Sequence, residues 1–181
     1  MFSGKTEELL RRMKRARLAR QTLLLFKPRH DDRYDELLVV SHEGVRADAV
    51  PVATAAELLA QVPSEVSVVG IDEVQFFDDA IVPAAECLAA RGVRVVAAGL
   101  DVDWRGNPFG PTPALVAVAE YVTKLHAVCA RCGGLATRSQ RLVAATGRLF
   151  VGGSSEYEPR CRTCFEQPRE DVGPVADDRE T

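Results

Sequence analysis

The chain has 181 residues, of which 46% are hydrophobic and 27% charged, with a formal net charge of −3 at pH 7. This composition is ordinary for a globular protein with a real core, and the length suits one domain with an appendage or two small domains. The charge balance gives no overall attraction to nucleic acid or membrane, and no apolar run reaches the length of a membrane span. The first twenty residues are charged, unlike a secretory signal peptide, and we expect a cytoplasmic protein.

The N-terminal part of the sequence predicts a helix followed by short strands. Apolar side chains recur at helical spacing over residues 5–20, with arginines and lysines on the opposite face, which we interpret as a solvated face. A short apolar run over residues 22–27 ends at Pro28 and predicts a buried strand. Residues 29–54 indicate loop and short strands, and residues 55–61 a brief helix.

The middle of the chain predicts a strand–helix–strand unit. Residues 66–71 read as an apolar, β-branched strand covered on both faces. A helix is expected over residues 79–91, ending at Gly92, and a second fully buried strand over residues 93–97. This order indicates a right-handed βαβ unit and a parallel sheet, so the fold class is α/β. Cys87, in the helix, is interpreted as a buried thiol in a reducing cytosol.

A long loop, D-V-D-W-R-G-N-P-F-G-P-T-P, follows the second strand. Loops at the carboxyl ends of parallel strands are where such folds bind ligands. Residues 114–128 are expected to return to regular structure, and a β-like ribbon between cysteine pairs follows. The tail is acidic and poor in aromatics, which is typical of disorder. We therefore expect a main domain over residues 1–126, a small second domain over residues 127–165 and a disordered tail over residues 166–181.

Two C-x-x-C pairs occur late in the chain, Cys129 with Cys132 and Cys161 with Cys164. A two-residue gap lets a tight turn aim both sulfurs at one point, and two such turns supply the four soft ligands of a tetrahedral site. The pattern predicts structural Zn²⁺ with no position left for catalysis. The alternative is two disulfides in a secreted domain.

The chain opens M-F-S-G-K-T directly before the expected first helix. Ser3, Gly4, Lys5 and Thr6 match the end of the Walker A pattern G-x-x-x-x-G-K-[ST]. In such loops, backbone N–H groups wrap the phosphates, the lysine reaches the β- and γ-phosphates, and the hydroxyl binds Mg²⁺. The leading glycine and the strand that feeds the loop have no counterpart in the chain.

An acidic pair supports the nucleotide interpretation. Asp72 and Glu73 follow the strand expected over residues 66–71. An apolar strand that ends in an acid is typical of the Walker B motif, whose aspartate holds Mg²⁺. The alternative is two surface acids at a strand end. Combined with the G-K-T motif and the βαβ pattern, the pair predicts a site for a nucleotide and Mg²⁺.

Together these motifs resemble a known family. M-F-S-G-K-T-E-E-L-L-R-R, I-D-E-V-Q-F-F, G-L-D-V-D-W-R-G-N-P-F-G and C-A-R-C followed by V-G-G-S-S-E-Y-E-P-R-C-R-T-C closely resemble the zinc-containing thymidine kinases of bacteria and the animal cytosol. The resemblance runs in order from Met1 to about Phe165. It implies phosphorylation of the 5′-hydroxyl of thymidine by ATP, a RecA-like P-loop domain with a mainly parallel sheet, a small zinc-bound lasso domain and a homotetramer.

The resemblance also implies roles for single residues. Glu73 would be the catalytic base, Asp72 the Mg²⁺ acid, and Gln75 would border the nucleotide. Residues matching the family's D-x-R segment near the transferred phosphate are Asp31, Asp32 and Arg33. The thymine would lie in an apolar slot, where the family usually has phenylalanine in place of Trp104. The slot would be formed by Leu100, Trp104, Phe109 and Tyr157, and by lasso backbone at Arg148, Leu149, Phe150, Val151, Gly152 and Gly153.

Relative to the family, the chain lacks the first strand and the leading glycine. From this we expect that Met1 is an internal methionine, that the natural start lies upstream, and that the chain as given binds ATP poorly. Two other functions stay open at the level of sequence. One is a P-loop ATPase whose zinc ribbon binds nucleic acid, with some positive charge from arginines such as Arg138 and Arg141. The other is a non-catalytic zinc-binding module with a decayed nucleotide site.

Overall fold

The computed structural model describes residues 1–29, 38–40, 46–143 and 155–167. Its core is a four-stranded sheet in the order β4-β1-β5-β6, in which every neighbouring pair is parallel. The α/β class with a parallel sheet is therefore confirmed. The strands of this sheet are β1 (Leu23–Pro28), β4 (Val50–Val52), β5 (Val68–Ile71) and β6 (Arg94–Ala97).

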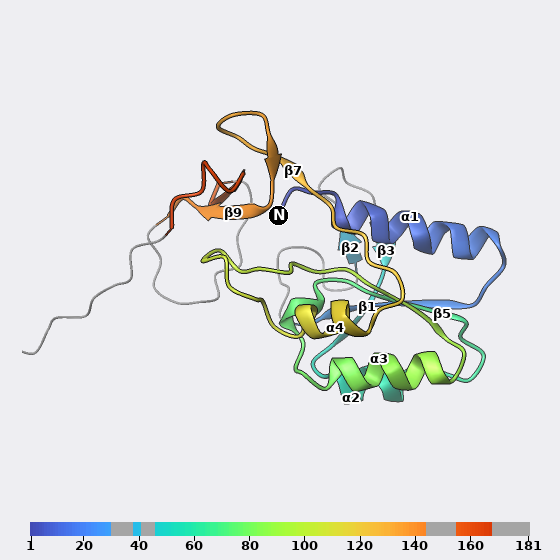
Figure 1. The fold of residues 1–181 in the computed structure, drawn as a ribbon. Coiled ribbons are helices and arrows are strands. Elements are labelled where there is room, and N and C mark those ends of the chain that lie inside the picture. Colours follow the sequence, from blue (N-terminus) through green and yellow to red (C-terminus); the bar gives the residue numbers. More distant parts are fainter. Residues whose placement is uncertain (30–37, 41–45, 144–154, 168–181) are drawn as a thin grey trace, which may run out of the picture.

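Helices cover both faces of the sheet (Figure 1). α1 (Lys5–Leu18) lies on one face, and α2 (Ala55–Ala60) and α3 (Ile81–Ala90) lie on the other. Alternation along the strands divides the apolar side chains between two cores, because successive residues point to opposite faces. The α1 core includes Leu9, Met13, Leu25 and Val68, and the opposite core includes Phe26, Val69, Ile71, Ile81 and Leu88.

Two burial predictions in the βαβ unit are wrong. The second strand was expected to be fully buried, but in β6 Arg94 and Ala97 are exposed and Val96 is buried. β6 lies at the edge of the described sheet, where packing on both faces is incomplete. Cys87 is also exposed, because the buried positions of α3 are Ile81, Ala84 and Leu88, which lie on a different side of the helix.

The chain between the sheet and the cysteines is only partly regular. α4 (Thr112–Val118) starts close to the expected position, and the residues from 119 to 126 then belong to neither helix nor strand, so the expectation for residues 114–128 is partly wrong. Among the described residues, no helix combines the length and apolar character needed to cross a membrane.

Three two-stranded antiparallel sheets complete the described fold. β2 (Leu38–Val40) pairs with β3 (Arg46–Asp48). The cysteine-containing region holds the other two, and it lies beside the N-terminal residues in Figure 1. The ribbon predicted between the cysteine pairs corresponds to β8 (Leu135–Ala136), β9 (Arg138–Arg141) and β10 (Tyr157–Arg160). β8 pairs with β7 (Ala127–Val128), which precedes the first cysteine pair, and β9 pairs with β10.

Candidate active site and metal centre

The start of α1 and the end of β5 meet at one edge of the sheet. Gly4, the N-cap of α1, has φ 77° and brings no side chain to cap the helix, so the N–H groups of the first turn point at the same edge. A helix N-terminus of this kind favours anions, because unsatisfied N–H groups and the helix dipole both present positive charge. Asp72 and Glu73 directly follow β5 at that edge.

The side chains of the two motifs are in direct contact. Lys5 Nζ lies 2.8 Å from Glu73 Oε1 and 3.4 Å from Asp72 Oδ1. The Thr6 hydroxyl donates a hydrogen bond to Asp72 Oδ2 at 3.2 Å. Thr6, Asp72 and Glu73 are buried, whereas Lys5 keeps partial access to solvent. Residues separated by 67 positions in the sequence thus form one cluster of a lysine, a hydroxyl and two carboxylates.

Burial sets the electrostatics of this cluster. Loss of water around the carboxyl raises the pKa of Asp72 above its ordinary value. The Lys5 ammonium opposes that shift, and the negative charge of Glu73 adds to it. Two buried acids beside one another are costly unless cations compensate them. Oxygen ligands from Thr6 and Asp72 are those that Mg²⁺ prefers, so the donor set fits a hard divalent cation.

Glu73 occupies a backbone conformation that is rare for a side chain other than glycine. Its φ is 48° and its ψ 42°, in the left-handed region. The following residues form the short 3₁₀ helix η1 (Val74–Phe76), and Val74 N–H donates to Ala98 O at 3.0 Å. Strain of this sort persists where the surrounding structure imposes it, and it is concentrated at functional sites.

Gln75 lies between Glu73 and the loop that follows β6. Its Nε2 donates to Glu73 Oε2 at 2.6 Å, and its Oε1 accepts from Leu100 N–H at 3.0 Å. The side chain is buried. The partners in these two hydrogen bonds, a carboxylate and a loop amide, both belong to the protein itself.

The loop after β6 brings aromatic side chains toward the cysteine-containing region. The guanidinium of Arg141, on β9, lies 4.4 Å from the centre of the Trp104 ring and 5.8 Å from the centre of the Tyr157 ring. Arg105 lies on Trp104 as well, at 4.8 Å. Trp104 and Tyr157 thus share one cation. Sequence reasoning treated Arg141 only as ribbon charge, because nothing in its neighbourhood along the chain marks it as an aromatic contact.

The other expected slot residues are placed less closely together. Phe109 packs edge-to-face on Phe76, with ring centres 5.6 Å apart, and Leu100 is half-buried. Several expected site residues lie outside the described residues, namely Asp31, Asp32, Arg33, Arg148, Leu149, Phe150, Val151, Gly152 and Gly153.

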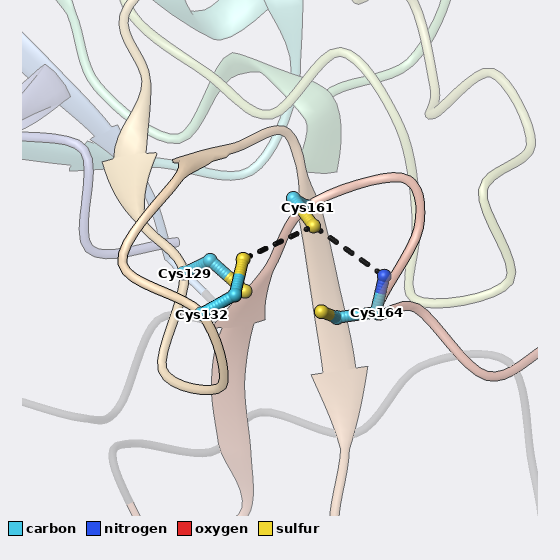
Figure 2. Close-up of side chains that lie close together, drawn as sticks. All are labelled: Cys129, Cys132, Cys161 and Cys164. Carbon is cyan, nitrogen blue, oxygen red and sulfur yellow. Dashed lines mark hydrogen bonds between the residues drawn. The ribbon is translucent and has the colours of Figure 1, made fainter.

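The four cysteines of the two C-x-x-C pairs converge (Figure 2). Their sulfurs all lie within 4.8 Å of one another, and the Sγ atoms of Cys132 and Cys161 are 3.7 Å apart. A tetrahedral zinc ion with Zn–S bonds of about 2.3 Å places its sulfurs ~3.8 Å apart. A disulfide needs about 2.05 Å. All four are free cysteines, so the disulfide alternative is wrong and the cluster fits zinc.

Local backbone geometry aims the sulfurs at a common centre. Gly133, with φ 73°, donates its N–H to Cys129 O at 2.9 Å and closes the first turn. A hydrogen bond from the backbone amide of Cys161 has the largest effect on Cys129 and lowers its pKa to about 6. The neighbouring sulfurs, of which that of Cys161 has the largest effect, raise the pKa of Cys164 to about 12. Four adjacent thiolates repel one another, and a divalent cation removes that repulsion.

Comparisons with known proteins agree with this geometry. A family model described as thymidine kinase matches residues 1–165. A thymidine kinase of Bacteroides thetaiotaomicron is 50% identical over 96% of this chain and 86% of its own length. One of Porphyromonas gingivalis is 55% identical over 91% of this chain and 80% of its own length. A thymidine kinase of a Rhodothermus species is 53% identical over 93% of this chain and 79% of its own length.

Proposed function

Because this chain belongs to the thymidine kinase family, we propose that its reaction, transfer of the ATP γ-phosphate to the 5′-hydroxyl of thymidine, takes place where Lys5, Asp72 and Glu73 meet. The observation that carries the assignment is the 2.8 Å contact between Lys5 Nζ and Glu73 Oε1. It joins a residue suited to holding phosphate and one suited to accepting a proton. Phosphoryl transfer needs little more than positioning and compensation of charge.

The donor end of the reaction belongs to the start of α1. The N–H groups that follow Gly4 and the Lys5 ammonium bind the phosphates of ATP. Thr6 and Asp72 would hold Mg²⁺, which when bound neutralises part of the phosphate charge. Asp31, Asp32 and Arg33 are proposed to lie near the transferred phosphate, on the strength of the motif alone.

The acceptor end of the reaction belongs to Glu73. As the 5′-oxygen forms its bond to the γ-phosphorus, the bond from that phosphorus to the bridging oxygen breaks and ADP leaves. The hydroxyl proton passes to the Glu73 carboxylate, which acts as general base. Lys5 contacts Glu73 Oε1. Attraction of Lys5 to the phosphates of ATP would free that oxygen for the alcohol.

The thymine is proposed to lie beside the loop after β6. The half-buried Trp104 offers flat apolar surface, and Arg141 lies against both its ring and that of the buried Tyr157. Leu100 and Phe109 extend this surface, and the lasso backbone from Arg148 to Gly153 is proposed to read the base. The P-loop domain of residues 1–126 and the lasso domain of residues 127–165 would thus both contribute to the nucleoside site.

The cysteine cluster is proposed to bind structural Zn²⁺. With all four ligands being cysteines, no coordination position is left for a reactant. The metal would close the chain between Cys132 and Cys161 into a loop and so reduce the entropy that the lasso loses when the nucleoside binds. A cluster of free thiols also supports a cytoplasmic location, where thiols stay reduced.

We further propose a homotetramer. Apolar side chains are exposed along α4 and the segment after it, and surfaces of this kind favour association between copies. The exposed residues are Val116, Val118, Tyr121 and Val122. Light scattering coupled to size-exclusion chromatography measures the mass of the particle. A monomer at micromolar concentration would contradict the proposal.

The catalytic assignment is tested with Glu73→Gln. Removing the base should lower kcat for phosphate transfer from radiolabelled ATP to thymidine by about 10²–10⁴-fold. Glu65→Gln, at an exposed position away from the site, is the matched control and should leave kcat unchanged. Wild-type turnover by Glu73→Gln would overturn the role of Glu73, and DNA-stimulated ATP hydrolysis without transfer to thymidine would favour the ATPase instead.

A further inference from the structure

Gln75 is placed to act on the catalytic base rather than on the nucleotide. We propose that Gln75 is a positioning residue that holds the Glu73 carboxylate and joins it to the loop after β6. This inference rests on the proposed role of Glu73. The sequence resemblance instead assigns Gln75 to the border of the nucleotide, so the two assignments predict different kinetics.

Both polar atoms of the Gln75 amide are used within the protein. Nε2 donates to Glu73 Oε2 at 2.6 Å, and Leu100 N–H donates to Oε1 at 3.0 Å. A backbone N–H can only donate and an ionised carboxylate can only accept, so the two partners fix which way the amide faces. An amide is the side chain that satisfies such a donor and such an acceptor together.

The loop encloses Gln75 closely from the other side. A Cβ added at Gly110, whose φ is 52°, would lie 2.2 Å from the Gln75 backbone oxygen. A Cβ at Gly99 would lie 2.8 Å from Gln75 Oε1. With only 3% of its surface exposed, Gln75 is held between the acidic turn and this loop. A movement of the loop is therefore transmitted to the Glu73 carboxylate.

The contacts also separate the two oxygens of Glu73. Oε2 is bonded to Gln75, and Oε1 is bonded to Lys5. Phosphate binding draws Lys5 away but leaves the Gln75 bond intact. The geometry therefore assigns Oε1 as the proton acceptor and Oε2 as the oxygen that fixes the orientation of the carboxylate.

The test compares Gln75→Met and Gln75→Glu with the wild type. Gln75→Met removes both hydrogen bonds at similar volume. Gln75→Glu keeps an acceptor for Leu100 but places a second carboxylate against Glu73. We expect kcat to fall by about tenfold to a hundredfold in both, the size expected for one charge-assisted hydrogen bond. Gln61→Met, exposed at the end of α2, is the control.

Binding and coupling measurements distinguish positioning from other roles. The Kd for a non-hydrolysable ATP analogue should stay within about twofold of wild type in Gln75→Met. In the Glu73→Gln background, adding Gln75→Met should lower kcat by less than about twofold more, because the residue it acts through is already inactive. If thermal unfolding shows that Gln75→Met does not fold, the same measurements of kcat and Kd are made on Gln75→Glu, alone and in the Glu73→Gln background.

Three outcomes would overturn the inference. They are wild-type kcat in both variants, a weakened Kd for the analogue with kcat unchanged, or the same loss of kcat with and without Glu73. The last outcome would indicate a merely structural effect. The proposed function fails separately, when wild type transfers no phosphate to thymidine or Glu73→Gln is fully active.

Discussion

The Lys5 ammonium is shared between two buried acids, at 2.8 Å from Glu73 and 3.4 Å from Asp72. Burying two carboxylates without a cation would be costly, so Lys5 stabilises the buried pair, and under the proposed function the same lysine also binds the phosphate donor. The sequence indicated each residue, but their contact follows from the fold.

Replacing Lys5 tests this dual role. Lys5→Met should lower kcat/KM for ATP by about a hundredfold or more, since it removes a charge aimed at the transferred phosphoryl group. Lys5→Arg should recover part of the activity because it keeps the charge. Initial-rate kinetics at saturating thymidine provide the measurement. Lys14→Met, exposed on α1, is the control, and wild-type activity of Lys5→Met would exclude phosphate binding by this residue.

Arg141 supplies the second prediction at this scale. Arg141→Met removes the cation shared by Trp104 and Tyr157. KM for thymidine should rise by about threefold to tenfold, the size of a partly desolvated cation–π contact, while KM for ATP stays the same. Arg105→Met should have a smaller effect, because Arg105 is exposed and contacts Trp104 from outside. Equal effects of the two variants on thymidine would argue against the shared-cation arrangement.

At the scale of elements, α1 carries ion pairs between its first turn and the turn that follows. Glu8 accepts hydrogen bonds from Arg11 at 2.6 Å and from Arg12 at 2.8 Å. These bonds, of which the one from Arg11 has the largest effect, lower the pKa of Glu8 from its ordinary 4.5 to about 2. Acids in the first turn also interact favourably with the helix dipole. Part of the basic face of α1 is therefore engaged locally.

A pH-dependent stability measurement tests these pairs. Glu8→Gln should lower the free energy of unfolding at pH 7 by about 0.5–1 kcal/mol, a small value because the pairs are close to solvent. Since the folded pKa is depressed, the stabilisation is complete above pH 4.5 and is lost as the pH falls toward 2. Urea denaturation of wild type and variant across this range provides the comparison, with Glu86→Gln on α3 as control. A constant difference down to pH 2.5 would contradict the assignment.

The elements also show what periodicity can and cannot predict. The sequence predicts β5 because residues 66–71 are almost all apolar, as a strand buried on both faces requires. The same reasoning wrongly predicts that β6 is fully buried. The apolar residues of β6 do not reveal that this strand lies at the edge of the described sheet, where Arg94 and Ala97 are exposed. The resemblance places Gln75 at the border of the nucleotide because Gln75 belongs to the same motif as Asp72 and Glu73. Its contact with Leu100 comes from the loop after β6 folding back, which no local pattern encodes.

At the scale of the whole molecule, the cysteine cluster joins two hairpins. Among the described residues, the buried members of its hydrophobic cluster are Ala127, Cys129 and Ala136. Under the proposed function, Zn²⁺ bound by the four cysteines would add to the stability of these hairpins. The sequence predicted this site in full, because all four ligands come in two close pairs. Their spacing alone constrains the geometry.

Metal removal should therefore separate the two parts of the protein. After treatment with a strong zinc chelator, or in Cys161→Ser, we expect loss of hydrogen-exchange protection in β7–β10 and retention of protection in β1 and β5. KM for thymidine should rise more than KM for ATP, because Tyr157 and Arg141 lie on the affected hairpin. Metal analysis should find zinc in the untreated protein. Full protection of β9 and β10 after complete removal of zinc would refute a structural role for the metal.

The Lys5 contact described above has a consequence for the choice of phosphate donor. A ligand that binds the Lys5 ammonium must compete for it with the carboxylates of Asp72 and Glu73. The favourable electrostatic energy of binding grows with the negative charge that the ligand brings to the start of α1. Under the proposed function, a triphosphate should therefore gain more from the start of α1 than a monophosphate, because each added negative charge strengthens the attraction to Lys5 and to the N–H groups of the first turn.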